Sequence, residues 1–346
     1  MKPRSQPNQG RGEAPPPADL AALSRLADGF LITQLLGVAV ELGIGSALAA
    51  GPRRGAELAA AVGADPDRLT RVLRGLAAEG VLDEAADGKF ALTSCGAALP
   101  LLEGAIRVRA GLYNHAAGRL VDAVRAGGVP FELAHGVSLF AHLDGQPEHA
   151  AAFHASMADR SQQEAREVVA AYDFGGVGRV VDVGGGVGRL LAEILLAAPD
   201  ATGELIDRPA AVAAARSTLD AAGVGPRASC TEGDFFEALP TGGDVYLLSR
   251  VLHDWADDDA RRILRSCSLA MTPAARLLIV DVVLGRRPAD NPAAVRMDLL
   301  MMVLLGARER TEAELASLLA DTGFALRRCV DTGSASGIAI LEASLC

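Results

Sequence analysis

The stretch GRVVDVGGGVG, residues 178–188, decides the fold of this chain. It is an apolar strand that runs into a glycine-rich turn, and the segment LLAEILLAAP behind it has the composition of a helix. More apolar runs follow and alternate with helical segments; they are residues 203–209, 228–236, 244–253 and 275–284. Because each run is continuously apolar, we predict an α/β fold, a doubly wound and mostly parallel sheet covered by helices on both faces. Residues 318–345 add a helix and two strands, which we expect to form an antiparallel hairpin at one edge of the sheet.

The glycine turn predicts a binding site for a nucleotide-like ligand. Gly184, Gly186 and Gly188 form G-x-G-x-G at the first strand–helix crossing, where glycines let the backbone approach a ligand closely. The dinucleotide fingerprint G-x-G-x-x-G would need a third glycine where Arg189 stands, and the phosphate-binding sequence G-K-[ST] is absent. The alternative is a tight turn with a purely structural role.

The next two strands end in residues that suit the parts of adenosine. Asp207 ends the second strand, where a carboxylate can accept hydrogen bonds from both ribose hydroxyls. Asp234 and Phe235 end the third strand, where they could bind the adenine amine and pack on the ring. Nothing supplies a cluster for phosphates, so we expect an adenosine derivative without them.

A catalytic histidine is indicated at the same edge of the sheet. His253 is the only histidine in the α/β half, at the carboxyl end of the fourth strand, and Asp281 lies at the corresponding end of the fifth. Ligands bind along that edge of such sheets. A neutral imidazole is a suitable base, and a carboxylate on its far nitrogen fixes the tautomer. A strand-end histidine with a structural role is the alternative.

The N-terminal part predicts a smaller helical domain. Residues 19–50 read as two apolar helices that break near Gly29 and expose more apolar surface, over residues 30–44, than a small domain would hide. A partner chain could cover this surplus. A helix at 54–62, a second helix capped by Asp65 and a hairpin turning at Asp87-Gly88 then make a winged-helix pattern.

The winged-helix pattern leaves two interpretations open. Arg68, Arg71 and Arg74 give its second helix a basic face, as in DNA-binding proteins. However, the chain has a formal net charge of −10 and a pI of about 5.2, which makes it a poor general binder of nucleic acid or anionic membrane. We therefore favour a structural module.

Composition and spacing set the remaining expectations. We predict a disordered tail over residues 1–17, the winged-helix-like domain over 18–105, a helical connector over 106–172 and the α/β domain over 173–346. The five cysteines are scattered and lack a C-x-x-C pair, no signal peptide is evident, and Gln34 and Glu41 interrupt the most apolar stretch. These features fit a cytoplasmic protein without a membrane span.

No metal is expected. His135, His142 and His149 are spaced seven apart, but glycines and a proline interrupt any continuous helix between them. We therefore expect no shared metal-binding face and place these histidines at the surface or along a pocket. No carboxylate, histidine or cysteine cluster has the sequence spacing of metal ligands.

Taken together, several motifs resemble one enzyme family. They are DVGGGVG, LIDRP, GDFFEALP, LLSRVLHDW, MDLLMMVLLGARERTEAEL and FHASMADRS, and the match covers nearly the whole chain. In this order they resemble the S-adenosylmethionine-dependent small-molecule O-methyltransferases, which include the caffeic acid and acetylserotonin enzymes and antibiotic-tailoring enzymes of actinobacteria. The Ala- and Arg-rich composition favours the antibiotic-tailoring branch. The resemblance implies a Rossmann-like catalytic domain, a homodimer formed through the N-terminal domain, and methyl transfer to a hydroxyl, most simply a phenolic one, on an aromatic natural product.

The resemblance also implies roles for individual residues. His253 matches the base, Glu309 matches the acid that orients it, and Asp281 falls where plant members place a second glutamate, although it is one methylene shorter. Asp254 matches a substrate-contacting position, while Met157 and Met301 match the phenol pocket or, equally, fill the core. The cofactor positions are Gly184, Gly186, Asp207, Asp234, Phe235, Ser161 and Ser249, the last standing where plant members have lysine.

Two other functions stay open. Some relatives bind the same cofactor but act as hydroxylases or pericyclases, and the pairing of His253 with Glu309 favours methyl transfer over such chemistry. A DNA-binding regulator whose α/β half senses a ligand is the other alternative, which the acidic charge disfavours.

Overall fold

A computed structural model describes residues 16–334 and 336–346, with the backbone alone at residues 154, 158 and 159. The chain divides into two compact units, residues 1–111 and 112–346. The predicted tail over residues 1–17 lies almost wholly outside the described residues. The domain boundaries predicted at residues 105 and 172 stay predictions.

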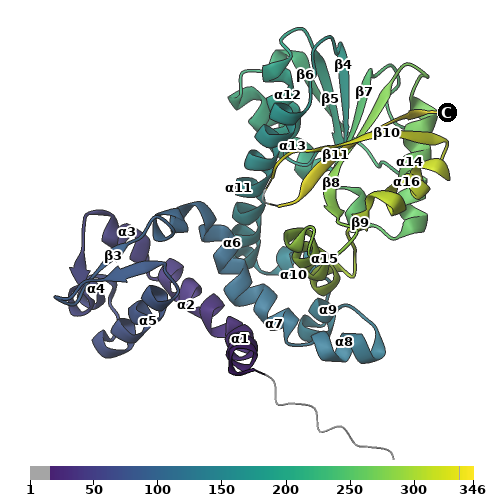
Figure 1. The fold of residues 1–346 in the computed structure, drawn as a ribbon. Helices are drawn as coiled ribbons and strands as arrows, with labels where there is room; N and C mark the ends of the chain where they lie inside the picture. Colours follow the sequence, from purple (N-terminus) through teal and green to yellow (C-terminus); the bar gives the residue numbers. More distant parts are fainter. Residues whose placement is uncertain (1–15, 335) are drawn as a thin grey trace, which may run out of the picture. The chain divides into compact units, whose positions relative to one another are not determined.

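The first unit contains the predicted helix–turn–helix and hairpin (Figure 1). Asp65 caps its second helix by accepting a hydrogen bond from the Arg68 backbone N–H at 2.9 Å, as expected. The region 19–50 forms three helices instead of two, because a left-handed Gly43 (φ 62°) adds a second break. The elements are α1 (Pro17–Ala27), α2 (Gly29–Glu41), α3 (Ile44–Ala49), β1 (Arg53–Arg54), α4 (Gly55–Val62), α5 (Pro66–Ala78), β2 (Leu82–Glu84), β3 (Lys89–Leu92), η1 (Gly96–Leu102), α6 (Glu103–Val108) and η2 (Arg109–Tyr113).

Helices α1 and α2 expose large apolar side chains. Leu23 is 66% exposed, Leu26 is 69% exposed and Phe30 is 57% exposed. Among the described residues, no single helix has the length and apolar character to cross a membrane, and α1 with α2 meets that test only as a pair bent by 43°. Exposed apolar surface is therefore present, but it lies on α1 and at the start of α2, whereas most of the apolar side chains in the predicted range 30–44 pack in or against the core of the unit.

The second unit begins with a run of helices and continues as the predicted α/β alternation. Its helices are α7 (Asn114–Ala117), α8 (Leu120–Ala126), α9 (Pro130–His135), α10 (Leu139–Gly145), α11 (Pro147–Ala171), α12 (Arg189–Ala197), α13 (Pro209–Ala221), η3 (Gly225–Arg227), η4 (Leu252–Asp254), α14 (Asp257–Ala270), α15 (Pro292–Leu305) and α16 (Glu312–Ala320). Its strands are β4 (Arg179–Val183), β5 (Thr202–Asp207), β6 (Ala228–Glu232), β7 (Val245–Ser249), β8 (Arg276–Leu284), β9 (Arg310–Thr311), β10 (Phe324–Asp331) and β11 (Ile338–Leu345).

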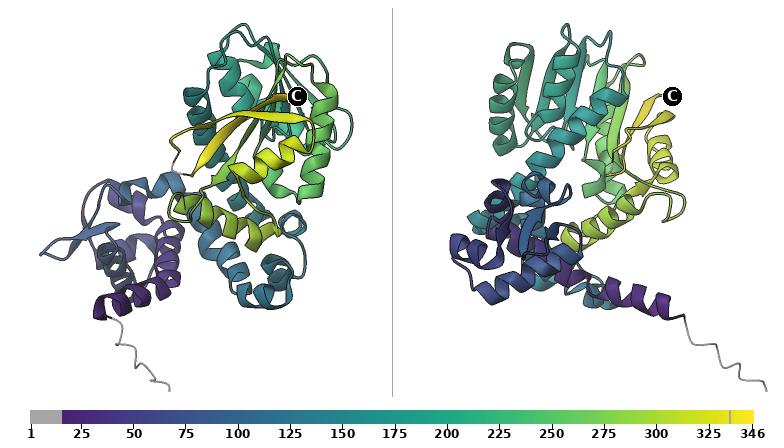
Figure 2. Two further views of the ribbon diagram at one scale, coloured as in Figure 1. Left: turned by 45° about the vertical axis from the view of Figure 1, so that its right-hand side comes forward. Right: turned by 60° about the vertical axis from the view of Figure 1, so that its left-hand side comes forward.

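The sheet has the order β10-β11-β8-β7-β4-β5-β6, with β9 paired to β8. The strands from β8 to β6 are parallel, whereas β11 is antiparallel to both β8 and β10. Figure 2 shows this hairpin in yellow at one edge of the sheet. The predicted fold class, including the edge hairpin, is confirmed.

Alternate residues of each central strand enter two separate cores. Val180, Leu205 and Leu247 pack on one face with residues of α11, α12 and α13. Val181 and Leu248 pack on the other face with residues of α14 and α16. Because both faces are covered, the polar strand-end residues are left to gather at the carboxyl edge.

Candidate active site

The glycine turn and Asp207 are joined directly. Asp207 Oδ2 accepts a hydrogen bond from the Gly186 backbone N–H at 2.8 Å, and Gly184 N–H donates to the Ile206 carbonyl at 2.8 Å. Gly184 and Gly186 both have left-handed backbones, with φ of 71° and 57°, which explains why glycine stands at these positions. A side chain at Gly184 would also meet Phe235, so the segment that follows the third strand reaches across to the glycine turn.

The third strand end is ordered by its own turn. Asp234 Oδ1 accepts from the Phe236 backbone N–H at 2.9 Å, and the Phe235 ring lies 5.8 Å from the Trp255 ring. Ser249 ends β7 and is half-buried. These predicted cofactor residues therefore share the carboxyl edge with Gly184, and their roles stay predictions.

Asp182 is a buried acid that the sequence analysis missed. It is 1% exposed beneath the glycine turn, and neither carboxylate oxygen has a hydrogen-bond partner. Burial, with a smaller contribution from the Asp207 charge, raises the pKa of Asp182 to about 7. The available signal was an aspartate in the middle of the apolar run VVDV.

His253 lies in η4 with Glu309 beside it. The distance from His253 Nδ1 to Glu309 Oε1 is 3.0 Å, and both side chains are buried. Asp281 Oδ1 lies 4.0 Å from the same nitrogen, which is beyond hydrogen-bond range. On the other side of the ring, His253 Nε2 lies 3.4 Å from Asp254 Oδ1. The three predicted catalytic residues are thus brought together, with Glu309 rather than Asp281 holding the ring.

Opposing influences act on the charge of His253. Burial and the Arg250 charge lower its pKa, while Asp281, Glu309 and Asp254 raise it, and the net shift is upward. Burial raises the pKa of Asp281 to about 7 despite the nearby histidine. Burial also raises the pKa of Asp254. The pKa values of His253, Asp281 and Asp254 are thus all raised in this cluster.

Long-range contacts fix Glu309 and the histidine loop. The Glu309 backbone N–H donates to Asp298 Oδ1 on α15 at 2.9 Å, and β9, which begins at the next residue, pairs with β8. Arg310 is buried and donates to the carbonyls of Leu252 and Trp255, each at 2.7 Å. Arg310 and Asp298 were not predicted, because the pairing of β9 with β8 and the packing of α15 against η4 bring them here from distant parts of the sequence.

A half-buried arginine completes the cluster. Arg250 Nη1 lies 3.5 Å from Glu309 Oε1, and Arg250 Nε lies 4.0 Å from Glu164 Oε2 on α11. Sequence reasoning missed Arg250 and Glu164; the only signal for the former was a charged residue between the apolar runs of LLSRVLH.

The histidine cluster differs from the expectation that no group of histidine, cysteine or carboxylate side chains is arranged like metal ligands. The ligand atoms of His253, Asp281 and Glu309 all lie within 4.8 Å of one another, although the sequence showed no such spacing. Folding creates this group from three distant segments. The Arg250 guanidinium already places a positive charge beside Glu309, and it would repel an added cation there.

The remaining predicted residues lie on the helices of the same unit. Met157 and Ser161 are half-buried on α11, and Met301 is buried on α15, which also packs against η4. Asp254 is the most exposed member of the histidine cluster. The pocket role of the two methionines stays a prediction.

The helix breaks gather the histidines instead of separating them. His142 Nε2 lies 2.9 Å from His149 Nδ1, and the His135 ring centroid lies 4.6 Å from that of His142 and 4.8 Å from that of His115. Burial and the neighbouring histidines lower the pKa of His135, and burial with His149 lowers that of His142. Among the described residues, however, they do not converge as metal ligands do.

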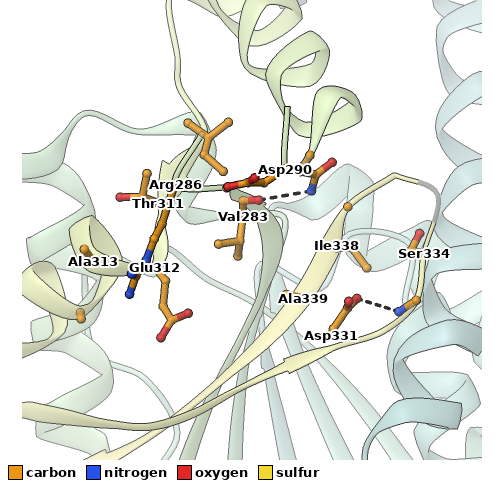
Figure 3. Close-up of a pocket in the computed structure, with 16 residues that line it drawn as sticks. Val283, Arg286, Asp290, Thr311, Glu312, Ala313, Asp331, Ser334, Ile338 and Ala339 are labelled. Carbon is orange, nitrogen blue, oxygen red and sulfur yellow. Dashed lines mark hydrogen bonds between the residues drawn. The ribbon is translucent and has the colours of Figure 1, made fainter. Parts of the chain in front are cut away.

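A separate cavity of about 610 Å³ lies beyond the end of β8. Figure 3 shows Arg286, Asp290, Glu312 and Asp331 around it together with Ile338. None of the predicted site residues lines it, and we assign it no role.

Comparisons with known proteins identify the family. Residues 118–325 match the family model of the O-methyltransferase domain, and residues 24–100 match that of the O-methyltransferase dimerisation domain. The chain therefore belongs to the O-methyltransferase family that the motifs resemble.

Individual relatives agree with this assignment. The chain is 41% identical to the mitomycin biosynthesis 6-O-methyltransferase of Streptomyces lavendulae over 86% of each sequence. The solved structure of the mitomycin 7-O-methyltransferase MmcR superposes with a TM-score of 0.86 and 38% identity, covering 95% of this chain and 98% of that one. The neocarzinostatin enzyme NcsB1, solved with S-adenosylmethionine and 2-hydroxy-5-methyl naphthoic acid, superposes with a TM-score of 0.76 and 32% identity over 91% of this chain and 96% of that one.

Proposed function

We propose that this chain transfers a methyl group from S-adenosylmethionine to a phenolic hydroxyl of an aromatic natural product, with His253 as the general base. The observation that carries the proposal is the 3.0 Å contact between His253 Nδ1 and Glu309 Oε1, at the edge of the sheet that the glycine turn also reaches. Family membership favours this reading over the hydroxylase, pericyclase and DNA-binding alternatives.

The strand ends fit an adenosine-bearing methyl donor. Asp207 is held beside the glycine turn, where its carboxylate can accept from ribose hydroxyls, and the half-buried Phe235 can cover the adenine. The space above Gly186 is open, since a side chain there would meet no atom within 4 Å. The donor supplies a methyl group already activated on its sulfonium. Gly184, Asp234, Ser249 and Ser161 are the further residues that we propose to contact it.

The geometry of His253 suits the removal of a phenolic proton. Because Nδ1–H donates to the Glu309 carboxylate, Nε2 carries the lone pair. In our proposal Nε2 takes the proton of the phenol, which has a pKa near 10, while the phenol oxygen forms its bond to the methyl carbon and the carbon–sulfur bond breaks. The products are the methyl ether, the neutral thioether S-adenosylhomocysteine and an imidazolium that Glu309 stabilises.

Asp254 offers an exit for that proton. Its Oδ1 lies 3.4 Å from His253 Nε2, and its side chain is 38% exposed. Burial raises its pKa, which favours proton acceptance. We propose that Asp254 contacts the acceptor, passes the proton to solvent and resets His253, while Met157 and Met301 line the aromatic ring.

We further propose that the protein acts as a cytoplasmic homodimer in antibiotic tailoring, without a nucleic-acid partner or a membrane partner. The exposed apolar side chains of α1 and α2 lie in or beside the matched dimerisation domain. The acidic charge supports the exclusion of nucleic acid and anionic membranes.

The decisive experiment is a screen for transfer of a labelled methyl group. The protein is incubated with labelled S-adenosylmethionine and a panel of phenolic polyketides, naphthoates and aromatic amines, and products are detected by mass spectrometry. We expect transfer to a phenol and, in His253→Ala, turnover lower by about 10²–10⁴-fold with unchanged donor affinity. A variant within about threefold of wild type at neutral pH would make positioning, not base catalysis, the mechanism.

A further inference from the structure

Arg250 has an unusual backbone for a residue with a long side chain. It is the only residue other than glycine with a left-handed backbone in the described part of the chain, with φ of 58°. That conformation is unfavourable for a residue with a Cβ atom. It occurs one residue after β7 ends, and its N–H donates to the Val280 carbonyl of β8 at 2.9 Å. The strained turn directs the guanidinium toward α11 and Glu309.

The guanidinium sits among four carboxylates from separate segments. Glu309 lies 3.5 Å away and Glu164 of α11 lies 4.0 Å away, while Asp281 of β8 and Asp254 of η4 add their charges. Glu309, Glu164 and Asp281 are buried, whereas Arg250 is half-buried and Asp254 is exposed. The same Glu309 oxygen, Oε1, faces both Arg250 and His253.

The contacts differ from those of an ion pair built for stability. Arg250 Nη1 is buried without a hydrogen-bond partner, as are Glu164 Oε1 and Glu309 Oε2. A structural arginine forms short, paired hydrogen bonds, as Arg310 does with Asp257 at 2.8 and 3.0 Å. Arg250 therefore supplies charge to the cluster more than it supplies hydrogen bonds.

The positive charge of Arg250 affects the protonation of His253. Three carboxylates, Glu309, Asp281 and Asp254, face His253 and favour its protonated form, whereas the positive charge of Arg250 opposes them. Without it, the carboxylates would retain a proton on the imidazole, and a protonated imidazole cannot accept another from a phenol.

Building on the proposed function, we propose that Arg250 is a positioning residue: its positive charge, held beside Glu309 behind the imidazole, opposes the protonation of His253 and so favours the form of the ring that can act as a base. It reaches the acceptor only through these two residues. The strain at its backbone is the means by which the chain places a guanidinium behind the catalytic pair.

The test replaces Arg250 by Met, which removes the charge, and by Lys, which retains it. In Arg250→Met we expect the pKa of His253 to rise by about one pH unit or more, the effect of losing a nearby positive charge. The acid limb of the kcat/KM profile should move upward by the same amount, so that the activity loss is largest at low pH and shrinks at high pH. Arg250→Lys should restore most of the profile. Arg261→Met, which removes a more exposed arginine paired with Asp321, is the matched control and should change neither quantity.

The imidazole is followed by NMR in the full-length protein labelled with ¹³C-histidine, and the His253 signal is assigned by its loss in His253→Gln. This titration needs no turnover, so it tests Arg250 even if no acceptor is methylated and the proposed function fails. If Arg250→Met does not fold, Arg250→Gln takes its place. An unchanged titration of His253, or an activity loss equal at all pH values, would overturn the inference.

Discussion

Replacing Glu309 by Gln removes a single charge from the catalytic pair. The amide oxygen can still accept from His253 Nδ1–H, so the ring keeps its tautomer while the stabilisation of the imidazolium is lost. A hydrogen bond to a charged group contributes about 1.5–3 kcal/mol, and the 3.0 Å contact with a Glu309 side chain that is 1% exposed places it in this range. That corresponds to a loss of about 10–10²-fold in kcat.

The assay follows the release of S-adenosylhomocysteine from pH 6 to pH 10 with a saturating acceptor. The contact with Glu309 raises the pKa of His253, so in the variant the acid limb should move to lower pH, opposite to the shift expected for Arg250→Met. The loss should shrink as pH approaches the pKa of the acceptor, where phenolate forms unaided. Glu312→Gln, the same change at an exposed position of α16, is the control. Turnover of Glu309→Gln within about threefold of wild type at neutral pH would refute the reasoning.

Further predictions concern binding, assembly and pH-dependent stability. Asp207→Ala should weaken S-adenosylmethionine binding at least about tenfold by calorimetry, since it removes the acceptor proposed for two ribose hydroxyls, and unchanged affinity would remove it from the site. Sedimentation equilibrium should show a dimer that Phe30→Asp weakens; a wild-type monomer at micromolar concentration would contradict the proposed interface. The pKa of Asp182 is raised from 3.8 to about 7, so its contribution lowers the free energy of unfolding as pH rises through this range. Denaturant titrations of Asp182→Asn should show no such decrease. The lowered pKa values of His135 and His142 should cost stability as pH falls below 6.5, and the thermal midpoint of His142→Gln should drop less on acidification than that of wild type.

The sheet was predictable because its evidence is local. Each central strand is a continuous apolar run whose alternate residues feed the two cores, as Val180 and Val181 do. The strand ends that carry Gly184, Asp207 and Phe235 could therefore be assigned to one edge of the sheet without any knowledge of long-range contacts. The break at Gly43 was missed because a glycine near the end of an apolar helix gives no sign that a third helix follows.

The arrangement inside the histidine cluster was only partly predictable. Position along the strands placed Asp281 near His253, but the separation of 4.0 Å and the closer approach of Glu309 depend on the pairing of β9 with β8. Arg250 and Asp182 were overlooked because a charged residue next to an apolar run reads as solvent-facing. Asp182 is buried and Arg250 is half-buried, and the charged groups that surround them come from segments far away in sequence.

Helix α15 couples the shape of the proposed acceptor pocket to the position of Glu309, although evolution of a new specificity would need only the first to change. It carries Met301, proposed to shape the acceptor pocket, and Asp298, which holds the backbone of Glu309. Substitutions that tilt or rotate this helix to admit a new acceptor would therefore also displace the partner of the base. New specificities should arise more readily through side-chain exchange at a fixed helix axis, which would keep Asp298 in place while Met301 and its neighbours diversify.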